Sequence, residues 1–416
     1  MSTPTPRVIT ISPLQVPFRL KTGAYAESME FRQLLSEVGQ LDPAIHIGKQ
    51  TLDQQYQDLS KDDVDVCLFR WQQDHQDAQL TLHIFPNSIA IAEIILPTRE
   101  FSTSAELEDW SQQYSSDIID QLWPKFLSLL KRIDTEITSS LLERGQDIHS
   151  IKPEAGSNLN KPKIHWISRT LAVDSNQLQQ AATQSLITEW LSQTEYPQQA
   201  QDIIAGQRFY SMTWLNYVVV DAEPTGDYRL ESMVLAQYYY TAQENCLQQL
   251  KQAIAAAYAE DQLKAAEKQL SQSRVATRLH LIDYHEQRKT LTRPKLRLLS
   301  EILDSWKFDS LVDNSQRMID VCSSRLEEVD HQRRERSTVM TDLLLVTLSF
   351  FAVFELSLYL VEFSREMMSR PALDYNDENT SFFLSKIAEV DTDVMFAFGF
   401  LLTLGLVLVY KRIKSH

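Results

Sequence analysis

Residues 343–360 read LLLVTLSFFAVFELSLYL, and Glu355 is the one charged residue in this run of eighteen. A helix needs about 17–25 mostly apolar residues to cross a bilayer. A second run, residues 394–410 (VMFAFGFLLTLGLVLVY), contains no charged residue and is followed by the basic tail KRIKSH at 411–416. We therefore expect two transmembrane helices, at 340–363 and 394–410. Two buried core helices are the alternative, which fits the uncharged second run poorly.

The charges around these runs predict their orientation. Basic residues precede the first run and follow the second, whereas residues 364–393 between them are mainly acidic. Because loops rich in Lys and Arg stay on the cytoplasmic side, both termini should be cytoplasmic in a multi-pass protein of the inner (cell) membrane. The expected cytoplasmic neck consists of Arg333, Arg334 and Arg336. The acids of the outer loop that would attract cations are Asp374, Asp377, Glu378, Asp391 and Asp393.

Upstream of the first run, apolar and small residues recur at heptad spacing. The seam is Phe308, Val312, Ser315, Ile319, Cys322, Leu326 and Val329, and the same steps continue into residues 343–357. We expect a stalk of long helices at 226–339, with one helix running from Pro294 to about Arg365, roughly 105 Å long. The alternative is an ordinary amphipathic helix that packs on its own domain.

The first 225 residues predict a different architecture. Four short alternating runs before residue 100 (RVITIS, VDVCLFRW, AQLTLHIF and SIAIAEIIL) indicate strands, with a turn at FPNS. A helix should begin at Ser104, and Pro124 should kink it. Two further strands are expected at 165–173 and 207–222, with a helix at 185–193 between them. The fold class is thus an α+β cytoplasmic domain at 1–225, with a possible subdivision near 146–163, followed by long helices and a C-terminal two-helix transmembrane hairpin.

Composition limits the classes of function. The net charge of −16 argues against a nucleic-acid partner, which would need clustered Lys and Arg, and is compatible with solubility alone. The three cysteines show no metal-ligand spacing, and no dinucleotide, P-loop, zinc-protease or serine-hydrolase motif is present. His280 and His285 are five apart, a poor metal spacing, and the aromatic run at 238–241 favours core packing over base stacking. We therefore expect a protein that is not an enzyme.

Glu355 raises the question of what an ionisable residue does inside a span. Such residues usually face a bundle interior or water, because lipid penalises them. Glu355 and Glu362 are seven apart and share a helix face, with Thr347 within about 80° of Glu355. Asp342 and Ser349 share another face. Two spans cannot enclose a pathway, so a ring of copies would be needed, in which either stripe could line a pore selective for cations. A Glu355 hydrogen-bonded across helices, or kept protonated, is the alternative.

The order of these segments resembles the CorA-type magnesium channel superfamily. Residues 314–354 (NSQRMIDVCSSRLEEVDHQRRERSTVMTDLLLVTLSFFAVF) are similar to that family's pore-helix entrance, and VYKRIKSH at 409–416 resembles its basic end. The resemblance covers about residues 225–416. It implies a funnel-shaped homopentamer with the first span lining the pore and the second facing lipid.

One hallmark of that family is missing. Its Gly-Met-Asn motif should follow the first span, where residues 360–377 read LVEFSREMMSRPALDYND, so no residue here inherits the selectivity-filter role. Without this motif magnesium selectivity does not follow from the resemblance, which leaves a divalent cation such as magnesium, a different cargo, or a nucleotide-derived messenger as the ligands to consider. We expect a cation channel gated by its cytoplasmic domain. The alternatives are an antiviral-defence effector of the type III CRISPR kind, triggered by a nucleotide-derived messenger, and a non-conducting membrane scaffold.

Overall fold

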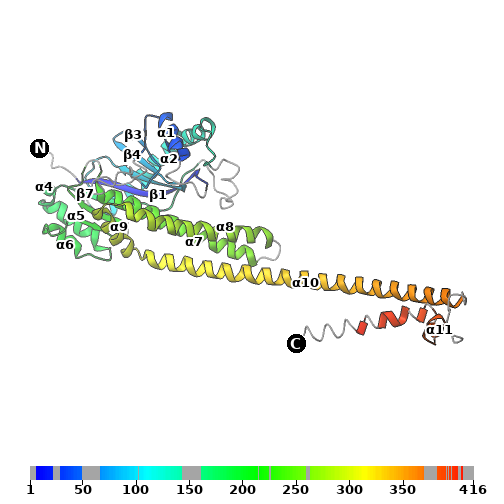
Figure 1. Ribbon diagram of the computed structural model, residues 1–416. Coiled ribbons are helices and arrows are strands. Elements are labelled where there is room, and N and C mark those ends of the chain that lie inside the picture. The colour runs from blue at the N-terminus through cyan, green and yellow to red at the C-terminus, as the bar shows by residue number, and fades with distance from the viewer. Residues whose placement is uncertain are drawn as a thin grey trace. The chain divides into compact units, whose positions relative to one another are not determined.

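The computed structural model describes residues 6–21, 29–48, 66–101, 103–142, 161–213, 215–223, 226–258, 263–369, 382–389, 391, 393–394, 396–401 and 404–405. The chain forms two compact units, residues 1–322 and 323–416 (Figure 1). The first begins as an α/β domain built on one sheet, and the rest of the chain is mostly helical. This is the order of classes that the sequence predicts.

The sheet of the first unit is organised around β1 (Arg7–Arg19). This strand pairs antiparallel with β5 (Asn87–Ile95) on one side and with β7 (Ser168–Val173) on the other. The strand order is β2-β3-β4-β5-β1-β7-β9-β8, and β6 pairs with β1. The remaining strands are β2 (Ile45–His46), β3 (Phe69–His75), β4 (Ala78–Ile84), β6 (Lys163–Ile164), β8 (Tyr210–Met212) and β9 (Asn216–Val220).

The four strands predicted before residue 100 are confirmed as β1, β3, β4 and β5, and the turn at FPNS joins β4 to β5. Strands from both sides of residues 146–163 belong to the same sheet. The single strand expected at 207–222 is wrong, because this segment forms the antiparallel pair β8–β9. The chain reverses where Leu215 adopts a φ of 69° and where the Thr213 hydroxyl donates to the Asn216 carbonyl at 2.7 Å. Hydrophobic periodicity does not report a reversal of this kind.

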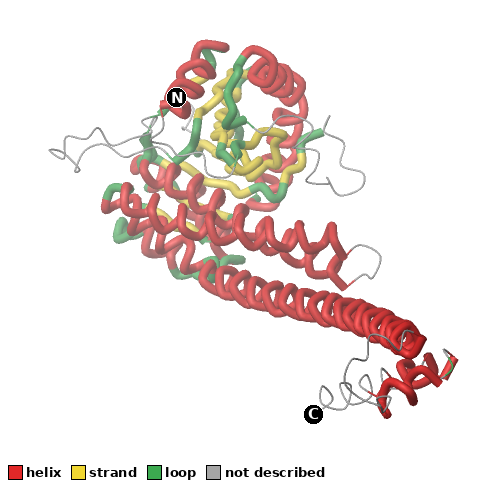
Figure 2. The backbone as a smooth tube through the Cα atoms, turned by 45° about the vertical axis from the view of Figure 1, so that its right-hand side comes forward, coloured by secondary structure: helices red, strands yellow, loops and turns green. Residues whose placement is uncertain are grey.

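Both faces of the sheet are covered by helices (Figure 2). Successive residues of β1 point to opposite faces, so Val8 and Leu14 enter one core while Ile9 and Ile11 enter the other. The first core is closed by α1 (Met29–Leu41), α2 (Ser104–Glu136), α5 (Ala181–Ser192) and α6 (Gln199–Ile204), and α4 (Ser175–Leu178) follows β7. The helix α2 begins where predicted, with the Thr103 hydroxyl accepting from the Glu106 amide at 3.2 Å, and continues through Pro124.

The second core contains most of the aromatic run at 238–241. It is closed by α7 (Tyr228–Tyr258), α8 (Leu263–Gln287), α9 (Arg293–Ser305) and the start of α10 (Phe308–Ser369), and the 3₁₀ turn η2 (Arg288–Thr290) lies between α8 and α9. Tyr238 and Tyr239 are buried, and Tyr238 stacks on Phe85 with ring centroids 3.8 Å apart. The packing interpretation of these tyrosines is confirmed. In the range expected to be part of a stalk, α7 thus packs against β1 and β5 of the sheet, and α8 and α9 pack against α7.

The single helix expected from Pro294 to Arg365 is wrong at one point. Pro294 lies in the first turn of α9 as predicted, but α9 ends at Ser305 and α10 begins at Phe308. Between them Lys307 adopts a φ of 55°. In an unbroken helix the side chains of Trp306 and Phe308 would point in directions about 160° apart, toward nearly opposite sides. The break lets both enter the second core, where each lies within ring contact of Tyr240.

The heptad seam has two different surroundings. Phe308, Ser315, Ile319 and Cys322 are all at most 1% exposed, so this part of α10 packs as an amphipathic helix on its own domain, as the alternative interpretation had it. Met340 and Leu343, further along the same register, are 69% and 67% exposed. The division between the two units falls directly after Cys322.

The second unit contains the rest of α10, the helix α11 (Phe382–Glu389) and further helical residues among 393–405. Phe350 and Phe354 of α10 make edge-on contacts with Phe396 at 5.9 and 5.1 Å between ring centroids, and Phe350 contacts Phe400 at 6.2 Å. The helix α10 continues to Ser369, a few residues beyond the helix end expected at about Arg365. The basic tail at 411–416 and most of residues 402–410 lie outside the described residues.

Candidate functional site

The apolar part of α10 is the first candidate site. Among the described residues, the segment Thr338–Glu366 of α10, which has 29 residues, is long and apolar enough to cross a membrane. Only 6% of the most apolar stretch of 18 residues in this segment is buried. A core helix of a soluble domain would be mostly buried, so this exposure favours the membrane over the core-helix alternative for residues 343–360.

One face of this helix is covered within the second unit. Phe350 and Phe354 are half-buried against Phe396 and Phe400, while Val361 and Ser364 are 3% and 0% exposed. The hydroxyl of Ser364 donates to the Leu360 carbonyl at 2.7 Å, so it is satisfied within the helix. This covered face is therefore apolar in its contacts with the rest of the unit.

Glu355 lies on the opposite face. At 100° per residue it is about 140° from Phe350 and about 180° from Ser364. Its carboxylate is exposed, as is that of Glu362 on the same stripe. The neighbours Leu348, Phe351 and Tyr359 are 67%, 60% and 67% exposed. The uncovered face thus carries two carboxylates among large apolar side chains.

The other stripe that the sequence offered lies at a different angle. Asp342 and Ser349 lie about 120–140° from Glu355, and Asp342 is half-exposed while Ser349 is exposed. Thr347 is exposed at the flank of the Glu355 face and donates its hydroxyl proton to the Leu343 carbonyl at 2.8 Å. Its oxygen lone pairs remain oriented for accepting a donor or a cation. The geometry therefore separates Glu355, Glu362 and Thr347 from Asp342 and Ser349.

The flanking charges are described only in part. Arg334, Asp391 and Asp393 are exposed. The side chains of Arg333 and Arg336, and the residues Asp374, Asp377 and Glu378, lie outside the described part of the chain. No three His, Cys, Asp or Glu side chains come close enough to hold a metal ion within one copy of the described residues.

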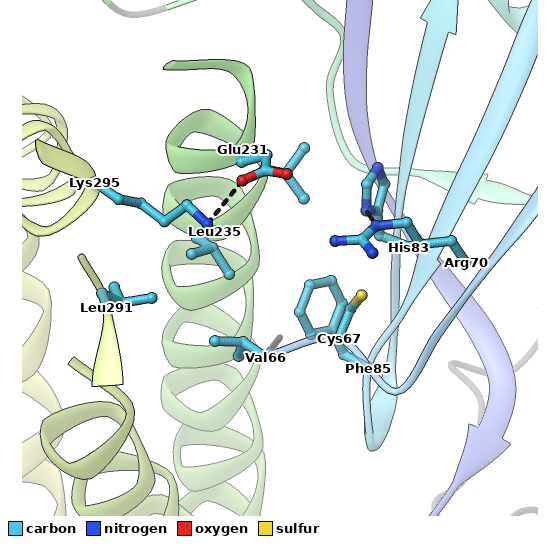
Figure 3. A pocket seen from close by; sticks show the side chains of 10 residues that line it. Val66, Cys67, Arg70, His83, Phe85, Glu231, Leu235, Leu291 and Lys295 are labelled. Atoms are coloured by element: carbon cyan, nitrogen blue, oxygen red, sulfur yellow. Dashed lines mark hydrogen bonds and ion pairs between the residues drawn. The ribbon is translucent and has the colours of Figure 1, made fainter. Parts of the chain in front are cut away.

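The second candidate site is a pocket in the first unit that sequence reasoning missed (Figure 3). It lies between strands β3 and β4 on one side and helices α7 and α9 on the other. Its polar groups are Arg70, His83, Glu231 and Lys295, beside Cys67. Its apolar wall consists of Val66, Phe85, Val234, Leu235 and Leu291. Residues from four segments far apart in the sequence meet here, which no local pattern can reveal.

Two charge-assisted contacts define the pocket. Arg70 and His83 are direct partners in the β3–β4 register, and Arg70 Nε donates to His83 Nδ1 at 3.3 Å. His83 Nε2 lies 3.0 Å from Glu93 Oε2. Because Nδ1 accepts from Arg70, a proton on Nε2 points to Glu93. On the helical side, Lys295 Nζ lies 2.7 Å from Glu231 Oε2, with the lysine side chain 9% exposed.

The two histidines on α8 play no part in either site. His280 is 8% exposed and lies against the rings of Tyr238 and Tyr239, while His285 is exposed. Burial lowers the pKa of His280 to about 4, although a hydrogen bond with the backbone of Tyr239 works in the other direction. The expectation that these histidines are packed or solvated is confirmed, with His280 packed and His285 exposed.

We compared the chain with protein-family models, curated proteins and solved structures. No family model, curated protein or solved structure matches this chain.

Proposed function

We propose that this chain forms a homo-oligomeric membrane channel that conducts cations, with the Glu355 face of α10 lining the pathway. One observation carries the proposal: the Glu355 face is uncovered, on the side of the helix opposite the contacts with Phe396 and Phe400. If residues 394–410 form a second span, this arrangement leaves the carboxylate face of the first span for other copies.

The energetics favour this use of the face. An ionised side chain at the centre of a bilayer costs at least about 2.5 kcal/mol, and such residues therefore face a bundle interior or water. A ring of copies that directs Glu355 inward removes the carboxylate from lipid and creates a ring of negative charge. Rings of Asp or Glu favour cations.

The cargo we propose is a divalent cation such as magnesium. Carboxylate and hydroxyl oxygens are the ligands that Mg²⁺ and Ca²⁺ prefer, and Glu355, Glu362 and Thr347 supply both kinds on one face. The resemblance to CorA-type channels favours a homopentamer with a two-helix hairpin, a cytoplasmic funnel and both termini in the cytoplasm. Because Gly-Met-Asn is absent, the selectivity would depend on the carboxylates of the span itself.

Glu355→Gln tests this role directly. It removes the charge and keeps the size, so the permeability for cations over anions should fall, by about tenfold if the carboxylate supplies about 1.4 kcal/mol of selectivity. The measurement is the reversal potential of the purified protein in planar bilayers under a salt gradient. Glu136→Gln, on the exposed surface of α2 in the first unit, is the matched control and should leave the potential unchanged. An unchanged potential for Glu355→Gln would remove this residue from the pathway.

A nucleotide-triggered effector is less well supported by the same structure. Pockets for ligands of that size occupy about 300–1,000 Å³. The pocket between β3, β4, α7 and α9 encloses ≈ 20 Å³. Among the described residues it is thus suited to a far smaller group than a nucleotide.

A further inference from the structure

We infer that the pocket between β3, β4, α7 and α9 binds the carboxylate group of a small organic acid. Arg70 and Lys295 contribute a guanidinium and an ammonium group to one cavity with an apolar wall. Figure 3 shows Arg70 entering from the sheet and Lys295 from the helical side. An apolar cavity with a few convergent polar groups is the usual form of a small-molecule site.

The charge of the lining selects an anion. Arg70 and Lys295 are positive and Glu231 is negative, so these three residues of the lining carry one net positive charge, while Glu93, which is not part of the lining, lies against His83. The chain as a whole carries a charge of −16, so the pocket has the opposite sign to its surroundings. The long-range field of the chain is screened over about 8 Å at physiological salt, whereas contacts inside the pocket are not.

The size of the cavity favours a carboxylate over a phosphate. About 10–15 Å³ holds one water molecule, and the cavity measures ≈ 20 Å³. The two oxygens of a planar carboxylate fit such a space better than the four oxygens of a tetrahedral phosphate. The planar guanidinium of Arg70 also matches a carboxylate in two parallel hydrogen bonds.

The orientation of Arg70 is set by a chain of contacts across three strands. Glu93 on β5 holds the Nε2 proton of His83 on β4, and His83 Nδ1 in turn accepts from Nε of Arg70 on β3. His83 is 5% exposed and so has little freedom to turn away. His83 and Glu93 are therefore positioning residues, and Arg70 and Lys295 would contact the ligand.

Glu231 gives the inference a distinctive signature. Its carboxylate already lies against Lys295, at 2.7 Å, so it competes with an incoming carboxylate and repels it. Glu231→Gln should therefore tighten binding, while Arg70→Gln should weaken it by about tenfold, the effect of losing about 1.4 kcal/mol. A residue that served packing alone would not produce opposite signs in these two variants.

The experiment is calorimetric titration of the full-length protein in detergent with sodium acetate and, separately, with inorganic phosphate at equal ionic strength. We expect saturable acetate binding, weaker in Arg70→Gln, tighter in Glu231→Gln and unchanged in Arg132→Gln, an exposed arginine on α2. Absence of saturable acetate binding, binding of phosphate alone, or shifts of one sign in Arg70→Gln and Glu231→Gln would each overturn the inference. If Arg70→Gln does not fold, Arg70→Lys replaces it, and the sign of the Glu231→Gln effect decides.

Discussion

At the scale of single residues, Glu355 shows both what the sequence can predict and what it cannot. A carboxylate inside an apolar run and its seven-residue spacing from Glu362 are visible directly. The choice between this stripe and the one containing Asp342 depends on which face Phe396 and Phe400 cover. That contact joins residues far apart in the chain, so helical periodicity alone could not identify it.

His280 predicts a dependence of stability on pH. Its pKa is about 4 in the folded chain because of burial, against about 6.5 when exposed. The unfolded chain therefore binds the proton more readily, and the free energy of unfolding should fall as the pH drops from about 6.5 toward 4, by up to about 3 kcal/mol. Equilibrium urea unfolding at pH 7 and pH 5, followed by circular dichroism, measures this loss. His280→Gln should lose less stability than the parent over this interval, whereas His285→Gln should behave as the parent does. Equal losses in His280→Gln and the parent would contradict the assignment.

At the scale of elements, periodicity predicted types better than boundaries. The alternating strands before residue 100 and the helix from Ser104 are present, because each buries one regular face. The breaks at Leu215 and Lys307 were missed. Both have a positive φ without a glycine, so the sequence lacks the residue that usually marks such a break. The pocket was missed for a related reason, since its residues come together only when α7 and α9 pack on the sheet.

Lys307→Gly tests the explanation of the break between α9 and α10. A left-handed backbone costs an L-residue about 1–2 kcal/mol, and glycine avoids this cost but loses more entropy on folding. We expect a net gain of about 0.5–1 kcal/mol in the free energy of unfolding, measured as a higher urea midpoint. Lys289→Gly in η2, where the described backbone has no positive φ, is the control and should lower that midpoint. A lower midpoint in Lys307→Gly would show that the side chain contributes more than the conformation costs.

At the scale of the whole molecule, the order of an α/β domain followed by a mostly helical remainder was predictable from the hydrophobic pattern and the composition of the two parts. Residues 1–225 alternate and contain turn residues, whereas no glycine occurs between Asp227 and Phe398. The extent of the first unit was not predictable. Its boundary after Cys322 depends on whether the seam of α10 finds a partner surface, and α7 and α8 supply one only in the folded unit.

The proposed ring requires several copies of the chain. Native mass spectrometry of the detergent-solubilised protein should give a multiple of the chain mass of 48.0 kDa, and a fivefold multiple is expected from the resemblance to CorA-type channels. If each copy contributes the two proposed spans, a monomer or a dimer has too few helices to enclose a pathway. Either of those masses would contradict the channel and favour the membrane scaffold, with Glu355 as a buried contact.

The central position of β1 has a consequence for how the chain is made. Residues 7–19 leave the ribosome before their partners β5 and β7, which follow only at 87–95 and 168–173. At about 5–20 residues per second, β1 waits for many seconds with both edges unpaired. Open strand edges are templates for aggregation. Slower initiation or a chaperone bound to the first twenty residues should therefore raise the soluble yield more than any change near the C-terminus.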